Sequence, residues 1–318
     1  MSKKQTVDVG IQVNMDEYEL QMRGGKIKLE NVKKIIFSGG FLKGYSFIGC
    51  INYLIENNID KQINTIIGSS VGSLVGLLFV LDYSIEELEK IDLNFNKYVN
   101  ITTENVINFT ETFGLDDGKK IIQFFKNIIY YKTSNYNITF KQLYELNKKT
   151  FVVTGTNLKK RKTEFFSHIT TPNMPVWIAI RISTSFPIFY NIVEYENKKY
   201  FDGAASSHCS IEFIEEIIKE TIDDTLCISI SKLNIFTEKE DNNLIIQDEL
   251  EQNNYGFFNY IMDMCGSLRY RDLKRLDKYS YNLLEINCDI NSFRENIKKE
   301  EIIQLINIGY NQIKAFFD

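Results

Sequence analysis

Two hydrophobic patterns alternate along the chain between residues 33 and 230. Short, continuous apolar runs are typical of buried strands, and longer segments with apolar residues at helical spacing are typical of helices. The predicted strands are residues 33–37, 64–67, 151–155, 164–166, 199–201 and 226–230. The predicted helices are residues 45–57, 71–81 and 177–185. Because strands and helices alternate, we expect an α/β fold with a mainly parallel central sheet covered by helices on both faces.

The same patterns divide the chain into three parts. Residues 1–30 form an N-terminal extension, in which apolar residues from Val7 to Val13 alternate with polar ones as in a half-buried strand. Residues 31–210 form the core, and the Asn-rich stretch at about 92–136 within it is expected to be helical. Residues 211–318 continue the same domain, mostly as helix, and close with an amphipathic helix.

Composition narrows the possible functions. The 318 residues include 37 Lys and Arg against 42 Asp and Glu, a net charge of -5, and 44% are apolar. These values exclude a disordered chain and a strongly basic protein that coats nucleic acid. The 5 Cys show no C-x-x-C spacing, which argues against a zinc site and a disulfide scaffold. Only His168 and His208 are present, so a mechanism that needs several imidazoles is excluded.

The sequence shows no segment that targets or spans a membrane. No apolar run suited to a signal peptide follows Met1. Residues 63–81 carry no charge, but their first half is rich in Gly, Ser, Asn and Thr, so a strand, a turn and a buried helix explain them better than a membrane span. We therefore expect a cytoplasmic or otherwise intracellular protein.

A G-x-S-x-G motif joins a predicted strand to a predicted helix: Gly68-Ser69-Ser70-Val71-Gly72. A nucleophile on such a strained turn projects from the edge of the sheet, and side chains two residues away on either side would collide there. The following helix directs its N-terminal dipole at the negative charge that develops during ester attack. The motif therefore indicates Ser70 as a nucleophile, although glycines that only let a helix pack close to a sheet would look the same.

A serine nucleophile needs a base, and the sequence offers three candidates. His208 follows Asp202 closely, and His168 lies in a strand-like stretch. A desolvated carboxylate can also accept the serine proton directly. Asp202 fits that role because it follows two aromatic residues at a strand end and precedes Gly203. An aspartate that merely closes a turn would give the same Asp-Gly pair.

A glycine-rich turn follows the first predicted strand and contains Gly39, Gly40, Phe41, Lys43 and Gly44. Backbone N–H groups in such a turn point at an anion, either a cofactor phosphate or an oxyanion. A dinucleotide fingerprint is excluded by Phe41, and a P-loop is excluded because no Gly-Lys-Ser/Thr follows. Together with the downstream serine motif, the turn predicts an oxyanion hole.

These pieces together resemble the patatin-like phospholipases, which are Ser–Asp lipid acyl hydrolases. The family pattern is a strand, a G-G-G-x-K/R-G loop, a G-x-S-x-G motif and, much later, D-G-A/G, which match residues 39–44, 68–72 and 202–204. The resemblance covers about residues 33–210. It implies a Ser70 nucleophile, an Asp202 base, and an oxyanion hole of the Gly39, Gly40 and Phe41 amides shaped by Lys43 and Gly44. No metal or cofactor is required.

The resemblance also implies a substrate and leaves alternatives open. The expected substrate is a membrane phospholipid or another lipid ester, reached by peripheral contact, with no nucleic acid partner. Phe41 stands where the family usually has a third glycine, so a non-catalytic lipid-binding or scaffold protein on the same fold remains an alternative. An α/β-hydrolase that uses His208 as base is another. The sequence does not determine whether the chain forms a homo-oligomer or needs a protein activator.

Overall fold

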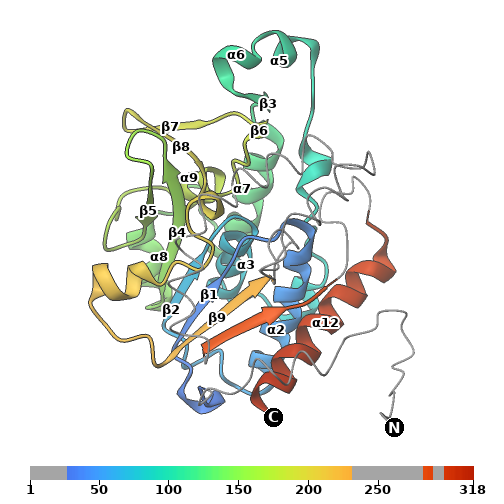
Figure 1. Cartoon of the computed structure of the whole chain (residues 1–318), viewed down its shortest axis with the longest axis vertical. Coiled ribbons are helices and arrows are strands. Elements are labelled where there is room, and N and C mark those ends of the chain that lie inside the picture. Colours follow the sequence, from blue (N-terminus) through green and yellow to red (C-terminus); the bar gives the residue numbers. More distant parts are fainter. Residues whose placement is uncertain (1–26, 231–281, 289–296) are drawn as a thin grey trace, which may run out of the picture.

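The computed structural model describes residues 27–230, 282–288 and 297–318 (Figure 1). The strand expected within the N-terminal extension lies outside these residues.

Within the described residues, an eight-stranded sheet forms the centre of the fold, in the order β10-β9-β1-β2-β4-β8-β7 with β5 also paired to β4. Its strands are β1 (Lys34–Phe37), β2 (Thr65–Gly68), β4 (Thr150–Asn157), β5 (Lys162–Phe166), β7 (Val193–Tyr195), β8 (Lys198–Asp202), β9 (Thr225–Ile230) and β10 (Leu283–Ile286). From β10 to β4 neighbouring strands run parallel, and β5, β8 and β7 join antiparallel. The expected α/β class with a mainly parallel sheet is confirmed.

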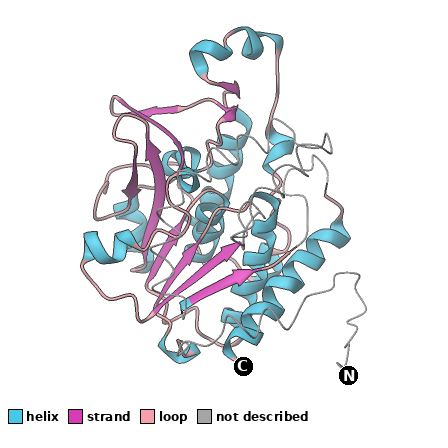
Figure 2. Ribbon diagram, in the orientation of Figure 1, coloured by secondary structure: helices cyan, strands magenta, loops and turns pink. Residues whose placement is uncertain are grey.

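Helices lie on both sides of this sheet (Figure 2). The α-helices are α2 (Tyr45–Glu56), α3 (Val71–Val80), α4 (Ile85–Leu88), α5 (Thr103–Ile107), α6 (Phe109–Thr112), α7 (Lys119–Thr133), α8 (Phe140–Asn147), α9 (Val176–Ser183) and α12 (Lys299–Phe317). The 3₁₀ turns are η1 (Leu29–Asn31), η2 (Phe41–Gly44), η3 (Phe95–Tyr98) and η4 (Gly203–Ala205), and η5 (Phe213–Ile218) is a π-helix.

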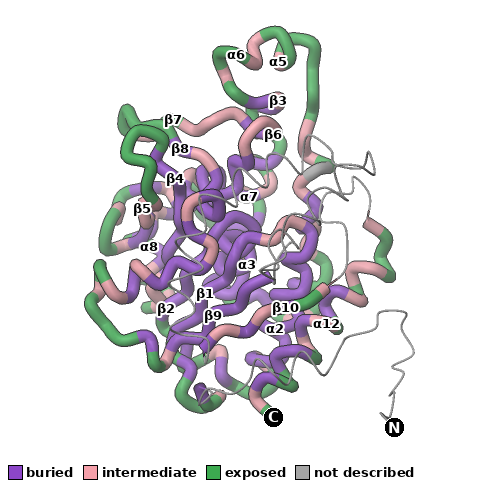
Figure 3. The backbone as a smooth tube through the Cα atoms, in the orientation of Figure 1, coloured by how far each residue is buried: buried purple, intermediate pink, exposed green. Residues whose placement is uncertain are grey.

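The central strands β1, β2, β4 and β9 are buried along almost their whole length, which explains their continuous apolar runs. In β1, Ile35 and Phe37 belong to the larger core, which also contains side chains of α2, α3, α9 and α12, whereas Ile36 points to a smaller core with η5. Figure 3 shows the middle of the sheet and α3 as largely buried. The sequence predictions for β1, β2, β4, β5, β8, β9, α2, α3 and α9 agree with the structure to within about two residues at each end.

Three short strands and one sheet edge differ from the sequence predictions. The stretch at 92–136 is only partly helical, because β3 (Gly114–Asp116) interrupts it and pairs with β6 (Ile188–Tyr190) in a separate two-stranded sheet. β7 was not predicted either. β10 lies in a segment expected to be mostly helical, yet it extends the central sheet beside β9. These strands are only partly buried, so they lack the continuous apolar run that reveals the four-residue strands β1 and β2, and their pairing partners decide their conformation.

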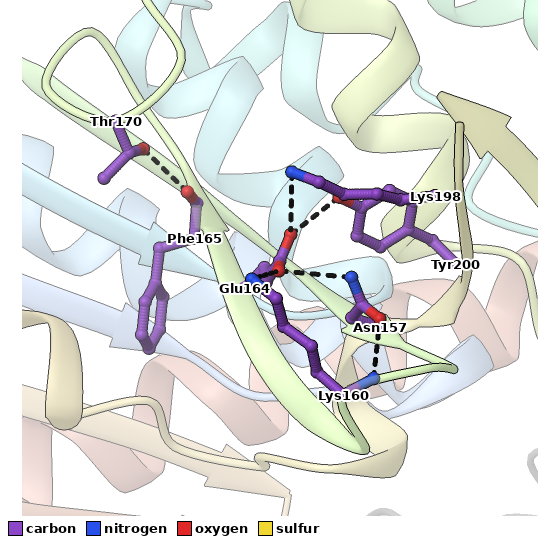
Figure 4. Close-up of polar contacts among 7 residues, drawn as sticks. All are labelled: Asn157, Lys160, Glu164, Phe165, Thr170, Lys198 and Tyr200. Atoms are coloured by element: carbon purple, nitrogen blue, oxygen red, sulfur yellow. Dashed lines mark hydrogen bonds and ion pairs between the residues drawn. The ribbon is translucent and has the colours of Figure 1, made fainter. Parts of the chain in front are cut away.

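A polar network braces the hairpin of β4 and β5 against β8, the strand that ends at Asp202 (Figure 4). Glu164 accepts hydrogen bonds from the Tyr200 hydroxyl at 2.6 Å, from Lys160 Nζ at 2.7 Å and from Asn157 Nδ2 at 3.1 Å. Partial burial opposes ionisation of Glu164, but the hydrogen bonds from Lys160 and Tyr200 outweigh it and lower the pKa of this carboxyl. The network ties the middle of β8 to the hairpin, two residues before Asp202, where β8 pairs with β4.

Among the described residues, no helix combines the length and the apolar character needed to cross a bilayer.

Candidate active site

The serine motif forms a sharp turn between β2 and α3. Ser70 caps the N-terminus of α3 with φ 53° and ψ -128°, a backbone conformation that residues other than glycine rarely adopt. Such strain persists only where the surrounding structure enforces it, and it is concentrated at functional sites. Here it directs the Ser70 side chain away from the helix and toward the neighbouring strands.

Close packing of backbone on backbone explains the two glycines of the motif. A Cβ on Gly68 would lie 2.4 Å from the Gly72 carbonyl oxygen, and a Cβ on Gly72 would lie 2.4 Å from the carbonyl oxygens of Phe37 and Ser38. Neither clash can be relieved by a side-chain rotation. The turn therefore keeps its shape only with glycine at both positions.

Asp202 ends β8 and meets Ser70 across a single hydrogen bond. The Ser70 hydroxyl donates to Asp202 Oδ2 at 2.7 Å, and the Ala204 N–H donates to Asp202 Oδ1 at 2.8 Å. The Thr156 hydroxyl donates to the Asp202 carbonyl at 2.7 Å. Ser70 is 7% exposed and Asp202 2%, so the pair is shielded from bulk water. Each carboxylate oxygen has its own donor, which fixes the orientation of the carboxylate toward Ser70.

The end of α9 holds both partners in place. The Ser70 N–H donates to the Ser183 hydroxyl at 2.9 Å, and the Asp202 N–H donates to the Ser185 carbonyl at 3.1 Å. The Arg181 guanidinium, in turn, donates to the Ser185 hydroxyl. Burial lowers the pKa of Arg181 to about 10, which still leaves it a cation at neutral pH. Sequence reasoning assigned Ser183 and Arg181 no role, because a serine and an arginine within an apolar helix carry no signal of their distant partners.

The glycine-rich loop lies directly against this pair. A Cβ on Gly39 would lie 3.4 Å from the Ser70 Cβ and 2.6 Å from the Ala204 Cβ, and a Cβ on Gly40 would lie 2.5 Å from Ile230 Cγ1. The Ser38 hydroxyl accepts from the Ile230 N–H at 3.0 Å and donates to the Gly39 carbonyl at 2.8 Å. The loop is therefore fixed between β9 and the serine turn.

The remaining residues of the loop and of the Asp-Gly turn pack closely around the pair. Lys43 is buried, and its N–H donates to the Gly40 carbonyl at 3.0 Å. Gly44 lies against Val71, the residue after Ser70, and Gly203 lies against Thr154 of β4. The residues of the loop, the serine motif and the Asp-Gly turn thus surround one point, at the carboxyl ends of β1 and β2.

Phe41 adopts a left-handed backbone conformation with φ 50°. This is the region that glycine enters without strain and that costs a residue with a Cβ free energy. The Phe41 ring packs edge-on against Phe186, with 4.9 Å between the ring centroids. The sequence departs from the glycine pattern at this loop position, where the backbone favours glycine.

An apolar pocket extends from the Ser70–Asp202 pair and has about 400 Å³ of empty space, including the part open to solvent. Its described lining is mainly aromatic; besides the pair it comprises Phe41, Val71, Phe95, Thr184, Phe186, Phe189 and Tyr190. Burial, followed by the charge of Asp116, raises the pKa of Tyr190, so its hydroxyl stays protonated. Phe95 and Tyr190 lie in segments without a motif, so sequence reasoning missed them. This apolar lining leads directly to the Ser70–Asp202 pair.

The two histidines have other surroundings. His208 Nε2 lies 3.4 Å from the Ile230 carbonyl oxygen. The His168 ring stacks on Tyr144 with 3.8 Å between centroids, and burial lowers the pKa of His168. The Ser70 hydroxyl donates to Asp202 instead. Over the part of the chain that the structure describes, no group of three or more His, Cys, Asp or Glu side chains is placed to hold a metal ion.

Comparison with known proteins matches the chain to a family model and to relatives of known sequence. The family model described as Patatin-like phospholipase matches residues 35–213, which include the loop, the serine turn and Asp202. An uncharacterized protein of Acanthamoeba polyphaga mimivirus is 28% identical over 298 residues, which cover 91% of this chain and 95% of that protein. A probable lipid hydrolase of Invertebrate iridescent virus 6 is 29% identical over 191 residues, or 58% of this chain and 64% of the relative.

Two solved structures share the fold. VipD from Legionella pneumophila superposes with a TM-score of 0.56 at 17% identity, covering 91% of this chain and 67% of VipD. The type III effector ExoU of Pseudomonas aeruginosa superposes with a TM-score of 0.51 at 13% identity, covering 90% of this chain and 53% of ExoU. At these identities the likeness concerns the fold alone.

Proposed function

Because the chain belongs to the patatin-like phospholipase family, we propose that it is a lipid acyl hydrolase that cleaves carboxylic esters, with Ser70 as nucleophile and Asp202 as base. The observation that carries the proposal is the 2.7 Å hydrogen bond from the Ser70 hydroxyl to Asp202 Oδ2, made by a serine on a strained turn. The name of the iridescent virus relative, a probable lipid hydrolase, supports the same activity.

The proposed reaction has two steps. Asp202 takes the Ser70 proton as Ser70 Oγ attacks the ester carbonyl, and collapse of the tetrahedral intermediate breaks the bond to the alcohol, which leaves with that proton. Water, deprotonated by the same Asp202, then hydrolyses the acyl-enzyme and restores Ser70. In this mechanism the acyl group next to the ester lies against the aromatic lining beside Ser70.

The oxyanion of each intermediate is stabilised by the loop and by the start of α3. In the proposed mechanism the backbone N–H groups of Gly39, Gly40 and Phe41 donate to it, and the N-terminal dipole of α3 adds to the favourable field. The contact of Gly39 with Ser70 supports this assignment, because the loop backbone approaches the nucleophile closely. Phe41 keeps its N–H, so its side chain does not remove a donor.

The experiment is hydrolysis of a soluble short-chain ester and of phospholipid vesicles by the wild type, Ser70→Ala and Asp202→Asn. Ser70→Ala is expected to reduce both rates to background, and Asp202→Asn to reduce them by at least about a hundredfold, the lower range for loss of a general base. The exposed residues Ser84 and Asp117 provide matched controls, Ser84→Ala and Asp117→Asn, which are expected to keep wild-type rates. Activity that survives Ser70→Ala with an intact fold would overturn the proposal.

The non-catalytic alternative makes the opposite prediction for covalent labelling. A fluorophosphonate probe is expected to label the wild type at Ser70, with loss of labelling in Ser70→Ala. A wild type that binds lipid but takes up no probe and hydrolyses no ester would instead favour a lipid-binding scaffold. His208→Ala is expected to remain fully active, since Asp202 accepts the Ser70 hydrogen bond.

A further inference from the structure

An arm, residues 101–113, projects from the body next to the pocket. It contains α5 and α6, and neither helix has a buried residue. Figure 1 shows α5 and α6 at the top of the molecule, beyond β3 and β6, and Figure 3 shows the same segment as largely exposed.

The arm presents apolar side chains to solvent. Its four most exposed large ones are Ile107 at 72%, Ile101 at 57%, and Val106 and Phe113 at 54% each. Single exposed apolar residues are normal on a protein surface, but four of them lie within these 13 residues, and such a concentration is typical of an interaction site.

Both ends of the arm are anchored to the residues that line the pocket. Before the arm, the carbonyl of the pocket residue Phe95 accepts a hydrogen bond from the Tyr190 hydroxyl at 3.2 Å. After the arm, β3 pairs with β6, where Asp116 lies opposite Tyr190. The buried Asp116 carboxylate also accepts from the N–H of Asn100 at the start of the arm and from that of Gly118 beyond its end, the latter at 2.6 Å. The base of the arm is therefore fixed relative to the pocket, while its apolar side chains face outward.

Position and charge favour one occupant of this surface. The base of the arm is tied to the residues that line the pocket, so the layer that holds the lipid substrate of the proposed reaction is the surface that the arm faces. The charged residues within the arm are Glu104 and Glu111, and no Lys or Arg occurs from residue 98 to residue 118, so the arm offers no attraction to anionic head groups.

We propose that the arm inserts its apolar side chains into a lipid layer with uncharged or zwitterionic head groups and so holds the pocket against the substrate surface. The inference rests on the proposed function, because it takes the substrate of the pocket to be a membrane lipid. Ile107, Val106 and Phe113 enter the acyl boundary, as the apolar face of an interfacial segment does. The acidic residues of the arm stay among the head groups.

Vesicle flotation of the full chain tests the arm directly. The wild type is compared with an arm variant that carries both Val106→Gln and Ile107→Gln. The matched control carries both Leu146→Gln and Ile303→Gln, two positions outside the arm whose side chains are 61% and 48% exposed. Phosphatidylcholine vesicles are expected to bind the wild type and the control equally. The arm variant is expected to bind about a hundredfold more weakly. Each of its two substitutions removes an aliphatic side chain whose transfer from water into the lipid contributes about tenfold in affinity. Binding is expected to persist from about 0.1 M to about 1 M salt, because it does not rest on charge.

Activity measurements separate the inference from the proposed function. The arm variant is expected to lose hydrolysis of vesicle phospholipid while it hydrolyses a soluble short-chain ester within about twofold of the wild type. If no ester is hydrolysed in a Ser70-dependent way but the arm variant loses binding, the proposed function fails and the arm assignment stands.

Three results overturn the arm assignment. The first is equal vesicle binding by the arm variant and the wild type. The second is binding of the wild type only to vesicles that contain phosphatidylserine. The third is a dimer of the wild type that the arm variant converts to a monomer, which would show that a second copy covers the arm.

Discussion

Comparing the variants Phe41→Gly and Phe41→Ala measures how the left-handed backbone conformation at Phe41 affects the free energy of unfolding. Both variants lose the contact between the Phe41 and Phe186 rings, so the difference between them does not depend on that contact. At φ 50° the Cβ of alanine costs roughly 1–2 kcal/mol, which glycine avoids. Glycine in turn loses about 0.5–1 kcal/mol more conformational freedom on folding. The net expectation is that Phe41→Gly is more stable than Phe41→Ala by about 0.5–1 kcal/mol.

A helical position provides the matched control, since the sign reverses there. Glu145 is exposed within α8, where alanine is more stable than glycine by about 1 kcal/mol. The assay is urea unfolding followed by circular dichroism. With a slope of about 3 kcal/mol per molar urea, the Phe41 pair should differ by about 0.2–0.3 M in midpoint in favour of glycine, and the Glu145 pair by about 0.3 M in favour of alanine. The same sign at both positions would refute the left-handed conformation of Phe41.

Two further predictions concern helix packing and acid stability. Gly49→Ala should lower the free energy of unfolding by more than about 3 kcal/mol, because its Cβ would lie 1.8 Å from the Ile306 carbonyl oxygen of α12; a urea midpoint equal to that of the wild type would contradict this. The hydrogen bond from Lys132, followed by that from the Ser84 N–H, lowers the pKa of Glu87 from 4.5 to about 2. The stability that this carboxylate contributes is therefore complete above pH 4.5 and is lost as the pH falls toward 2. In Lys132→Met the free energy of unfolding, measured by urea unfolding at each pH, should fall less between pH 4.5 and pH 2 than in the wild type. An equal fall in both proteins would count against the ion pair.

The sequence predicts the core strands and helices well because their burial leaves a direct hydrophobic pattern. The runs at β1, β2 and β9 are continuous because both faces of the sheet are covered. Local turn chemistry is equally visible, so Ser70 and Asp202 could be proposed without knowing the distance between them. The hydrogen bond that joins them spans 132 positions in the sequence, and only the order of the strands brings it about.

Features that depend on distant partners were not predictable. Ser183 is one of several similar residues in its segment, and its role as acceptor for the Ser70 N–H follows from where α9 ends relative to β2. β10 is four residues long, and its conformation depends on β9 beside it. The arm that contains α5 and α6 has no buried face, so it shows no helical period, and its relation to the pocket depends on the pairing of β3 with β6.

The position of β4 between β2 and β8 has a consequence for folding. Gly68 of β2 lies opposite Val153 on one side of β4, and Asp202 of β8 lies opposite Gly155 on the other, so the Ser70–Asp202 contact forms only after both edges of β4 are paired. Such non-local pairings are slow steps, because chain entropy is lost before they form. A nascent chain on the ribosome therefore contains Ser70 long before Asp202 is synthesised, and the proposed dyad stays incomplete until the sheet closes. The time course of fluorophosphonate labelling during refolding would follow that closure.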